Sequence, residues 1–260
     1  MTEVTSSLLT PNWVLIGATV QGSHHLLESA PCQDAQAFLS LKGALLVTIA
    51  DGLGSAPFAQ SGAELAVKAA METAGEQLAS GEPDEEEGWI ELMKVTFAAT
   101  RTRLEAEASQ QGASLSDFGT TLVLVILTNR WLAAAHIGDG AVVQQDSEDV
   151  FSTICVPQTG EYANETFSLT LPDALERVVY HASQVKIKAL GLLSDGLLRF
   201  SIRQTDFSPH IPFFGPLFNQ LQSITDPGKA AHSLAGFLSS EKVRSLSGDD
   251  KTLVLVGRIT

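Results

Sequence analysis

Cysteine is scarce in this sequence, with two residues in 260, Cys32 and Cys155. Secreted domains that depend on disulfides carry many more, so we expect the protein in the reducing cytoplasm. The two cysteines lie far apart along the chain, and two buried free thiols are favoured over one bridge between them. No Cys or His pair stands at zinc-ligand spacing, and no basic motif accompanies either cysteine as a thiolate nucleophile requires. We therefore interpret both cysteines as structural.

Long hydrophobic runs are also missing. Apolar stretches reach about ten residues, half of the roughly 20 that a membrane-spanning helix needs. The first residues, Met1 to Val4, lack the basic and apolar regions of a secretory signal. Linkers of low complexity and internal repeats are absent, and 44% of the residues are hydrophobic, enough for a substantial core. We therefore expect a single domain over residues 1–260 and no membrane partner.

Positive charge is in short supply as well. The chain has 16 Lys and Arg against 30 Asp and Glu, a formal net charge of −14. A nucleic-acid surface needs clustered Lys and Arg, so we expect no nucleic-acid partner. An acidic protein can still act on phosphate groups if bound metal ions supply the positive charge, and most of its carboxylates then serve as solubilising surface.

Hydrophobic patterning predicts a mixture of strands and helices. Short apolar runs bounded by turn residues are typical of strands, and a period near 3.6 is typical of helices. Strands are expected over residues 13–21, 35–41, 44–50, 120–128, 131–137, 141–145, 188–194 and 252–259. Helices are expected over residues 57–79, 89–109 and 227–239. The stretch 146–186 is assigned to short strands and irregular surface, and 208–216 to a loop because of its prolines.

Carboxylates beside glycine recur at the ends of these strands. The first case is Asp51-Gly52, which follows the apolar run 44–50. Each case alone is an ordinary turn signal. If several met at one place, their like charges would repel, and bound cations would have to neutralise them. Oxygen ligands of this kind suit Mg²⁺ or Mn²⁺. The other junctions are Gly138-Asp139-Gly140, Asp195-Gly196 and Gly248-Asp249-Asp250, with Gln33-Asp34 before an early strand.

The order of these motifs resembles the metal-dependent protein phosphatases of the PP2C (PPM) family, in particular a compact bacterial branch with Gln-Asp in its first motif. The resemblance extends over nearly the whole chain. It implies an α+β fold, a four-layer α-β-β-α sandwich of two antiparallel sheets flanked by helices. The motifs are Cys32-Gln33-Asp34, Ala50-Asp51-Gly52-Leu53-Gly54-Ser55, Gly119-Thr120-Thr121, Ile137-Gly138-Asp139-Gly140, Leu193-Ser194-Asp195-Gly196 and Gly248-Asp249-Asp250-Lys251-Thr252.

The resemblance also implies a centre with two Mn²⁺ or Mg²⁺ ions. Asp51 would bridge both ions, and the carbonyl oxygen of Gly52 would bind one of them. Asp195 and Asp249 would complete the other ion's protein ligands, and Asp34 would act through metal-bound water.

Several positions depart from the family pattern or extend it. Asp139 resembles the aspartate that, with Asp195, holds a third, weaker ion, and Asp250 stands where the family usually has Asn, a change we expect to be tolerated. Gln33 replaces a Glu as a candidate metal ligand, and Leu53 replaces a His that serves many members as candidate general acid.

The family commonly has an arginine that binds phosphate a few residues before the first motif. This arginine is missing from the segment between the expected strands 13–21 and 35–41. The only cationic candidates there are His24 and His25, and we take His24 as the candidate phosphate-binding or proton-donating residue. His136 lies within a strand of alanines and is expected to be a core histidine.

The expected activity is hydrolysis of phosphoserine and phosphothreonine in proteins by a metal-bridging hydroxide that attacks phosphorus in line with the leaving oxygen. Phosphorylated proteins are the expected partners, together with a bacterial Ser/Thr kinase that the enzyme opposes, and the protein is expected to be a monomer. Two alternatives stay open: a catalytically weak relative that only binds phosphoproteins, and a metallohydrolase that acts on small phosphoesters or nucleotides. Gln33 and the missing arginine favour the first alternative, whereas the retained aspartates oppose it.

Overall fold

The computed structural model describes residues 3–10, 12–158, 166–184 and 186–259. The chain folds into two compact units, each formed by segments that are far apart in the sequence. Unit 1 comprises residues 1–34, 141–156 and 186–260, and unit 2 comprises residues 35–140 and 157–185. The single domain over residues 1–260 stays a prediction.

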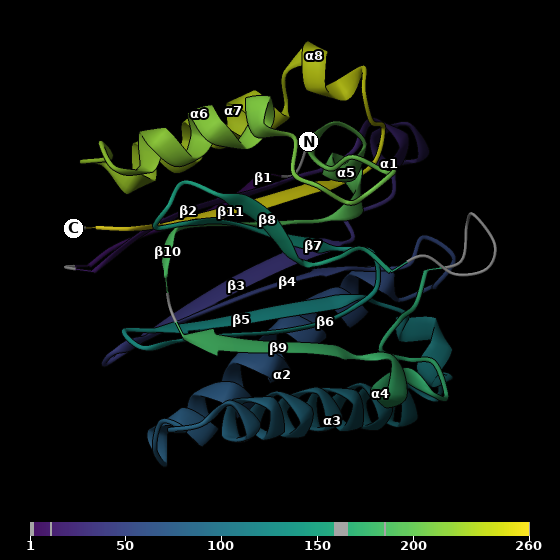
Figure 1. Cartoon of the computed structure of the whole chain (residues 1–260). Helices are drawn as coiled ribbons and strands as arrows, with labels where there is room; N and C mark the ends of the chain where they lie inside the picture. The colour runs from purple at the N-terminus through teal and green to yellow at the C-terminus, as the bar shows by residue number, and fades with distance from the viewer. Residues whose placement is uncertain (1–2, 11, 159–165, 185, 260) are drawn as a thin grey trace. The chain divides into compact units, whose positions relative to one another are not determined.

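Unit 1 is built on a six-stranded antiparallel sheet in the order β1-β2-β11-β10-β7-β8 (Figure 1). Its central pairing aligns β11 with β2 and β10, for example Leu255 opposite both Ile16 and Gly191. The three central strands are rich in leucine and β-branched residues, which fit a buried pleated surface. The strands are β1 (Glu3–Leu9), β2 (Trp13–Val20), β7 (Ala141–Asp146), β8 (Phe151–Cys155), β10 (Ile187–Leu193) and β11 (Lys251–Arg258).

Two helices of unit 1, α6 (Ile211–Leu221) and α7 (Pro227–Leu238), pack on this sheet. Phe214 and Phe218 of α6 and Leu234 of α7 are buried in the same hydrophobic cluster as Ile16 and Leu255. Shorter helices occupy the loops of the unit. These are α1 (Ser23–Glu28), the 3₁₀ helix η2 (Asp195–Leu197), α5 (Leu198–Ser201) and α8 (Glu241–Arg244).

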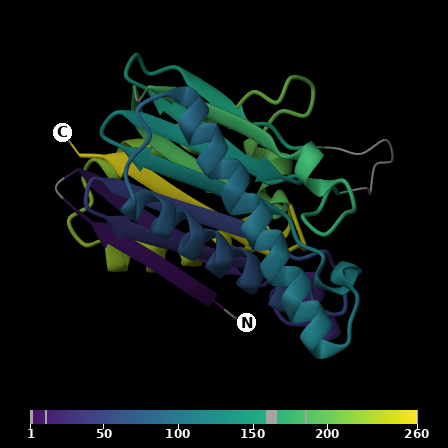
Figure 2. The same cartoon turned by 90° about the horizontal axis from the view of Figure 1, so that it is seen from below.

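Unit 2 carries a five-stranded sheet in the order β3-β4-β5-β6-β9. Its strands are β3 (Asp34–Leu41), whose first residue belongs to unit 1, β4 (Ala44–Asp51), β5 (Leu122–Thr128), β6 (Trp131–Ile137) and β9 (Val179–Gln184). The helices are α2 (Ala59–Ala79), α3 (Glu86–Gln111), the 3₁₀ helix η1 (Leu115–Phe118) and α4 (Ala174–Arg177). Figure 2 shows the two long helices α2 and α3 side by side on this sheet.

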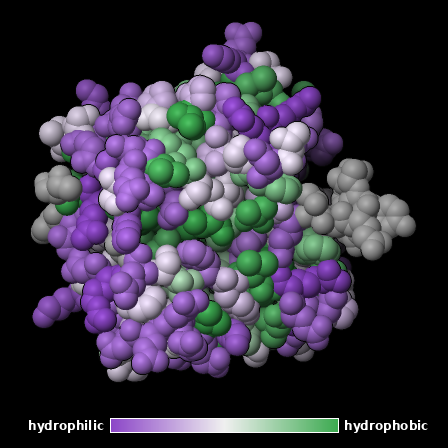
Figure 3. All heavy atoms as spheres, in the orientation of Figure 1, coloured by the Kyte–Doolittle hydropathy of each residue, from purple (hydrophilic) through white to green (hydrophobic). Residues whose placement is uncertain are grey.

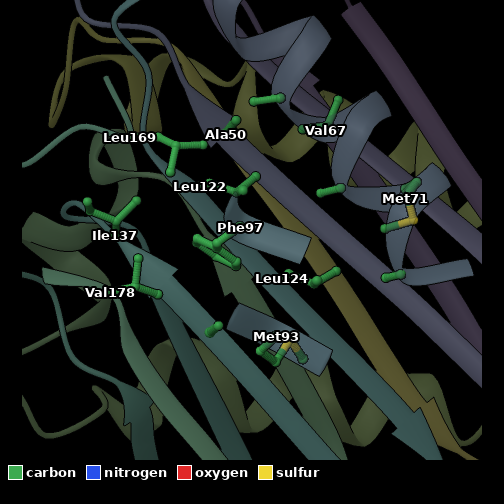
Figure 4. Close-up of a cluster of buried hydrophobic side chains, with 14 of the residues drawn as sticks. Ala50, Val67, Met71, Met93, Phe97, Leu122, Leu124, Ile137, Leu169 and Val178 are labelled. Atoms are coloured by element: carbon green, nitrogen blue, oxygen red, sulfur yellow. The ribbon is translucent and has the colours of Figure 1, made fainter. Parts of the chain in front are cut away.

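The core of unit 2 lies between these helices and the sheet. Figure 4 shows Phe97 and Met93 of α3 directed toward Leu122 and Leu124 of β5. Helix α2 contributes mainly alanines to this core, and their small side chains let its backbone pack closely. The buried alanines of α2 in this cluster are Ala63, Ala66, Ala70 and Ala74.

The helix α6 corrects the prediction of a loop over residues 208–216. Pro212 occupies the first turn of this helix, where a missing N–H costs nothing, and the helix tolerates Pro216 in its interior. The phenylalanines of α6 bury enough surface in the cluster of unit 1 to stabilise the helix despite both prolines. The segment between the expected strands 13–21 and 35–41 likewise contains a helix, α1, and β1 was not predicted.

The surface is largely hydrophilic on the face shown in Figure 3, as the excess of acidic residues predicts. Among the described residues, no helix combines the length and the apolar character needed to cross a bilayer.

Candidate metal and phosphate site

Asp34 is a buried carboxylate at the start of β3. Its Oδ2 accepts hydrogen bonds from Ser194 Oγ at 2.7 Å and Thr252 Oγ1 at 2.8 Å. Within the part of the chain that the structure describes, its Oδ1 has no hydrogen-bond partner. Burial raises the pKa of Asp34 to about 8; the charges of Asp250 and Asp195 also raise it, whereas the two hydroxyls lower it. A buried oxygen without a donor is costly, so this position suits a cation or an ordered water.

The two hydroxyl donors are fixed by the ends of neighbouring strands. Ser194 follows β10, and its Oγ accepts a hydrogen bond from the backbone N–H of Thr252 in β11 at 2.9 Å. The Ser194 N–H donates to the Thr252 carbonyl oxygen at 3.1 Å. The sequence motifs around Asp195 and Asp249 therefore also supply the groups that orient Asp34.

Asp250 connects the first loop of unit 1 to β11. Its Oδ1 accepts from the Gly22 N–H at 2.6 Å, and its Oδ2 accepts from the Gln33 N–H at 2.6 Å. His25 Nδ1 lies 2.9 Å from the same Oδ2. These contacts hold Gln33 and Asp34 in place. They also give His25 a structural role, in contrast to His24.

Asp195 and Asp249 line an open pocket of about 510 Å³ in unit 1. Asp195 begins η2 and is half-buried, whereas Asp249 is exposed. The exposed His24 lines the same pocket, and its backbone N–H donates to the Gly248 carbonyl oxygen at 3.0 Å. Two predicted ligands and the predicted catalytic histidine therefore share one pocket.

Lys251 is a buried cation that the sequence analysis missed. Its Nζ donates to the backbone carbonyl oxygen of Asp249. Burial lowers the pKa of Lys251, while the charges of Asp249, Asp250 and Asp34 act in the opposite direction. Lys251 thus offsets part of the repulsion among these carboxylates. Its position inside the Gly248 to Thr252 motif was the available signal.

In unit 2, Asp51 ends β4 and is held through its backbone. Its N–H donates to Thr121 Oγ1 at 2.9 Å, and its carbonyl oxygen accepts from the Thr121 N–H at 2.8 Å. Gly52 follows, and a Cβ added there would collide with the carbonyl oxygen of Ala59. The glycine that follows Asp51 is therefore required by a close backbone approach at the start of α2.

Asp139 accepts a hydrogen bond from Thr166 Oγ1 at 2.9 Å through its Oδ2. The preceding Gly138 donates its N–H to Gln158 Oε1 at 2.7 Å, and Gln158 Nε2 donates to the Arg177 carbonyl oxygen at 2.7 Å. Thr166 and Gln158 lie in the stretch that the sequence left irregular, and no pattern there indicated these roles.

Leu53 and His136 both lie in unit 2. A Cβ at Gly119 would lie 3.0 Å from Leu53 Cδ1, so this side chain packs against that glycine. Leu53, at the position where the resemblance leads us to expect a His, therefore makes an apolar contact. His136 is buried in β6, as expected.

Both cysteines are buried free thiols, which confirms that prediction. Burial raises the pKa of Cys155 to about 12. Burial also raises the pKa of Cys32, with the charges of Asp34 and Asp250 adding to the effect. A thiol so reluctant to ionise is a poor nucleophile.

The predicted metal ligands belong to both units. Gln33, Asp34, Asp195 and Asp249 lie in unit 1, whereas Asp51, Gly52 and Asp139 lie in unit 2. Among the described residues, no group of three or more His, Cys, Asp or Glu is arranged to hold a metal ion. The chemistry of the donors nevertheless suits Mg²⁺ or Mn²⁺, because all are oxygens. The buried Oδ1 of Asp34 and Oε1 of Gln33, both without a partner among the described residues, also fit a site that receives cations and water.

Comparison with known families decides the relationship. The model of the family described as protein phosphatase 2C matches residues 21–239. The chain belongs to this family. Serine/threonine-protein phosphatase 3 of Escherichia coli (strain K12) is 35% identical to it over 252 residues, which cover 94% of this chain and 98% of that protein. This protein phosphatase 2C is accordingly a metal-dependent serine/threonine protein phosphatase.

Solved structures agree on the fold of this protein phosphatase 2C. The catalytic domain of the serine/threonine protein phosphatase PstP, in complex with two manganese ions, matches with a TM-score of 0.61 at 15% identity, covering 96% of this chain and 99% of that one. RsbX in complex with magnesium matches with a TM-score of 0.57 at 13% identity, covering 98% of this chain and 100% of that one. They confirm the predicted α+β fold with two antiparallel sheets packed by helices.

Proposed function

We propose that this phosphatase hydrolyses phosphoserine and phosphothreonine in proteins with two Mn²⁺ or Mg²⁺ ions. Asp51, the carbonyl oxygen of Gly52, Asp195 and Asp249 would hold the two ions, and Asp139 with Asp195 would hold a third, weaker one. The observation that carries the proposal is that an aspartate is retained at each of these motif positions. The manganese and magnesium ions bound to PstP and RsbX support the choice of metals.

Two bound cations supply an activated water nucleophile and neutralise the charge of the phosphoryl group. Asp34 would orient water through Oδ1, because Ser194 and Thr252 already fix Oδ2. Gln33 would bind through Oε1, directly or through water. His24 would contact the phosphate or its leaving oxygen from the pocket that it shares with Asp195 and Asp249.

The biological setting is part of the proposal. Phosphorylated proteins would be its substrates, a bacterial Ser/Thr kinase would produce them, and the enzyme would act in the cytoplasm as a monomer. The name of the Escherichia coli relative, a serine/threonine-protein phosphatase, supports protein substrates.

The test compares Asp51→Asn with the wild-type chain on a phosphothreonine peptide, with Mn²⁺ and with EDTA. We expect EDTA to abolish activity and Asp51→Asn to lower kcat/KM by at least about 100-fold, since metal ions supply several kcal/mol of charge stabilisation. Calorimetric titration with Mn²⁺ should show weaker binding by the variant. Asp84→Asn is the control, because Asp84 is an exposed side chain in an exposed ion pair with Arg130.

Full activity in Asp51→Asn would show that the metal assignment is wrong. A small aryl phosphate, assayed in parallel, separates a protein phosphatase from an enzyme of small phosphoesters. A higher kcat/KM for the small ester than for every phosphopeptide would contradict the assignment of protein substrates.

A further inference from the structure

Two arginines line the pocket that contains Asp195 and Asp249. Arg199 belongs to α5, directly after η2, and Arg244 is the last residue of α8. Both side chains are exposed. The pocket therefore combines the carboxylates assigned to metal binding with arginine donors that reach solvent.

Further basic residues lie beside this pocket. A neighbouring pocket of about 580 Å³ shares Arg199 and is also lined by Arg203 and His210, and no acidic residue is among the described residues that line it. Lys242 stands on the same short helix as Arg244. Two exposed carboxylates stand among these cations. Glu241 is the first residue of α8. The pKa of Asp206 is lowered mainly by hydrogen bonds from Ser208, and the nearby charge of Arg203 adds to this effect.

Four of the chain's 16 Lys and Arg residues line these two pockets or lie on α8. We call Arg199, Arg203, Lys242 and Arg244 the basic rim. Arginine presents a planar set of N–H donors that matches a carboxylate or a phosphate. An exposed rim of this kind beside a reaction pocket fits an extended, anionic ligand.

We propose that the basic rim, above all Arg199 and Arg244, binds acidic residues that flank the phosphorylated residue of a protein substrate. The phosphatase then prefers phosphosites in acidic sequence. The inference rests on the proposed function, because the phosphorylated side chain must occupy the pocket of Asp195 and Asp249. Arginine can bind the oxyanions of both carboxylates and phosphates. The experiment therefore distinguishes binding of the flanking carboxylates from binding of the phosphate itself.

The experiment uses the full chain with Mn²⁺ and three phosphothreonine peptides that differ only in their flanks, which are Glu, Gln or Lys. We expect kcat/KM to fall in the order Glu, Gln, Lys. Each exposed ion pair contributes about 1.5- to 5-fold, so the ratio of the Glu to the Lys peptide should reach about tenfold. Raising NaCl should move this ratio toward one, because salt screens exposed charges.

The double variant Arg199→Glu, Arg244→Glu should invert the preference in favour of the Lys peptide. The ratio of two peptides in one enzyme preparation is independent of the fraction of active enzyme, so partial loss of folding does not affect it. The matched control is Arg103→Glu, Arg130→Glu, which makes the same change in net charge at exposed positions of unit 2. We expect it to keep the wild-type order.

Equal kcat/KM for the three peptides in the wild-type chain would overturn the inference and leave the proposed function intact. So would an unchanged ratio in the double variant, or the same inversion in the control, which would indicate a general effect of net charge. An equal loss on every peptide and on a small aryl phosphate would show that the arginines grip the phosphate, which also overturns it. A wild-type chain inactive on all the peptides would remove the proposed function and this inference with it.

Discussion

Asp250 has hydrogen-bond donors on both of its oxygens. Gly22 N–H reaches Oδ1, and Gln33 N–H and His25 Nδ1 reach Oδ2. An asparagine at this position, which the resemblance would have predicted, has one acceptor oxygen and one amide nitrogen. Its amide would face one of the backbone N–H groups and leave that donor without an acceptor. The aspartate therefore fits its surroundings better than the expected asparagine.

We predict that Asp250→Asn lowers the free energy of unfolding by about 1–3 kcal/mol, the cost of one buried donor left unpaired. Urea unfolding in EDTA measures this change without a contribution from metal binding. The control is Asp84→Asn, where the exposed ion pair with Arg130 contributes little. A variant as stable as the wild-type chain would show that the asparagine accommodates both N–H groups.

The sequence identified the aspartates of the candidate site because each stands beside a glycine or at a strand end. It did not identify Lys251, because membership of the Gly248 to Thr252 motif was the signal available and the motif does not show where the Nζ of a strand lysine lies. It also did not identify Arg199 and Arg244. Both arginines lie on short helices, α5 and α8, in which the sequence shows no clear helical period. Only the folded structure shows that they line the same pocket as Asp195 and Asp249.

Elements with one regular pattern were predictable, and elements with mixed signals were not. The strands β4, β5 and β6 are short apolar runs, and the predicted bounds nearly match the observed ones. Helix α6 was missed because its prolines are loop signals, whereas burial of Phe214 and Phe218 decides its conformation. Strand β1 mixes Ser and Thr with Leu, so its pairing with β2 rather than its own pattern makes it a strand.

Two helical glycines provide a matched test of what shapes α2 and α7. A Cβ at Gly62 in α2 would collide with the carbonyl oxygen of Phe118 in η1, whereas a Cβ at Gly236 in α7 would meet no atom within 4 Å. We predict that Gly62→Ala lowers the free energy of unfolding by about 1–3 kcal/mol through overpacking. Gly236→Ala should raise it by about 0.4–1 kcal/mol, since it restricts the unfolded chain and favours the helix.

Urea unfolding of the two variants beside the wild-type chain gives both signs. The substitutions are chemically identical, so opposite signs can only come from the surroundings of each glycine. If both variants raise the free energy of unfolding, helix propensity decides the effect and the contact between α2 and η1 does not. If both lower it, the prediction for Gly236→Ala is wrong.

At the scale of the molecule, the chain order of the motifs was enough to predict the family and the fold. It was not enough to derive the metal centre. Asp51 and Asp139 belong to unit 2, whereas Asp34, Asp195 and Asp249 belong to unit 1. The spacing of residues along the sequence does not give the distance between them in the folded protein. The assignment of one centre to residues of both units therefore rests on family membership, and the Asp51→Asn experiment tests it.

The net charge of −14 is a property of the whole molecule with a measurable consequence. Acidic side chains outnumber basic ones, so on average they repel one another in the folded state more than in the expanded chain. Salt screens this repulsion, since the Debye length falls from about 20 Å near 0.02 M to below about 10 Å near 0.3 M. Raising NaCl over that range should raise the thermal midpoint by about 2–4 °C, which corresponds to about 1 kcal/mol for a chain of this size.

The double variant Glu82→Lys, Glu148→Lys changes two exposed positions and makes the net charge less negative, so its midpoint should respond less to salt. A thermal midpoint that does not change with NaCl, or that changes equally in the variant and the wild-type chain, would contradict this prediction. Local ion pairs rather than net charge would then determine the electrostatic part of the stability.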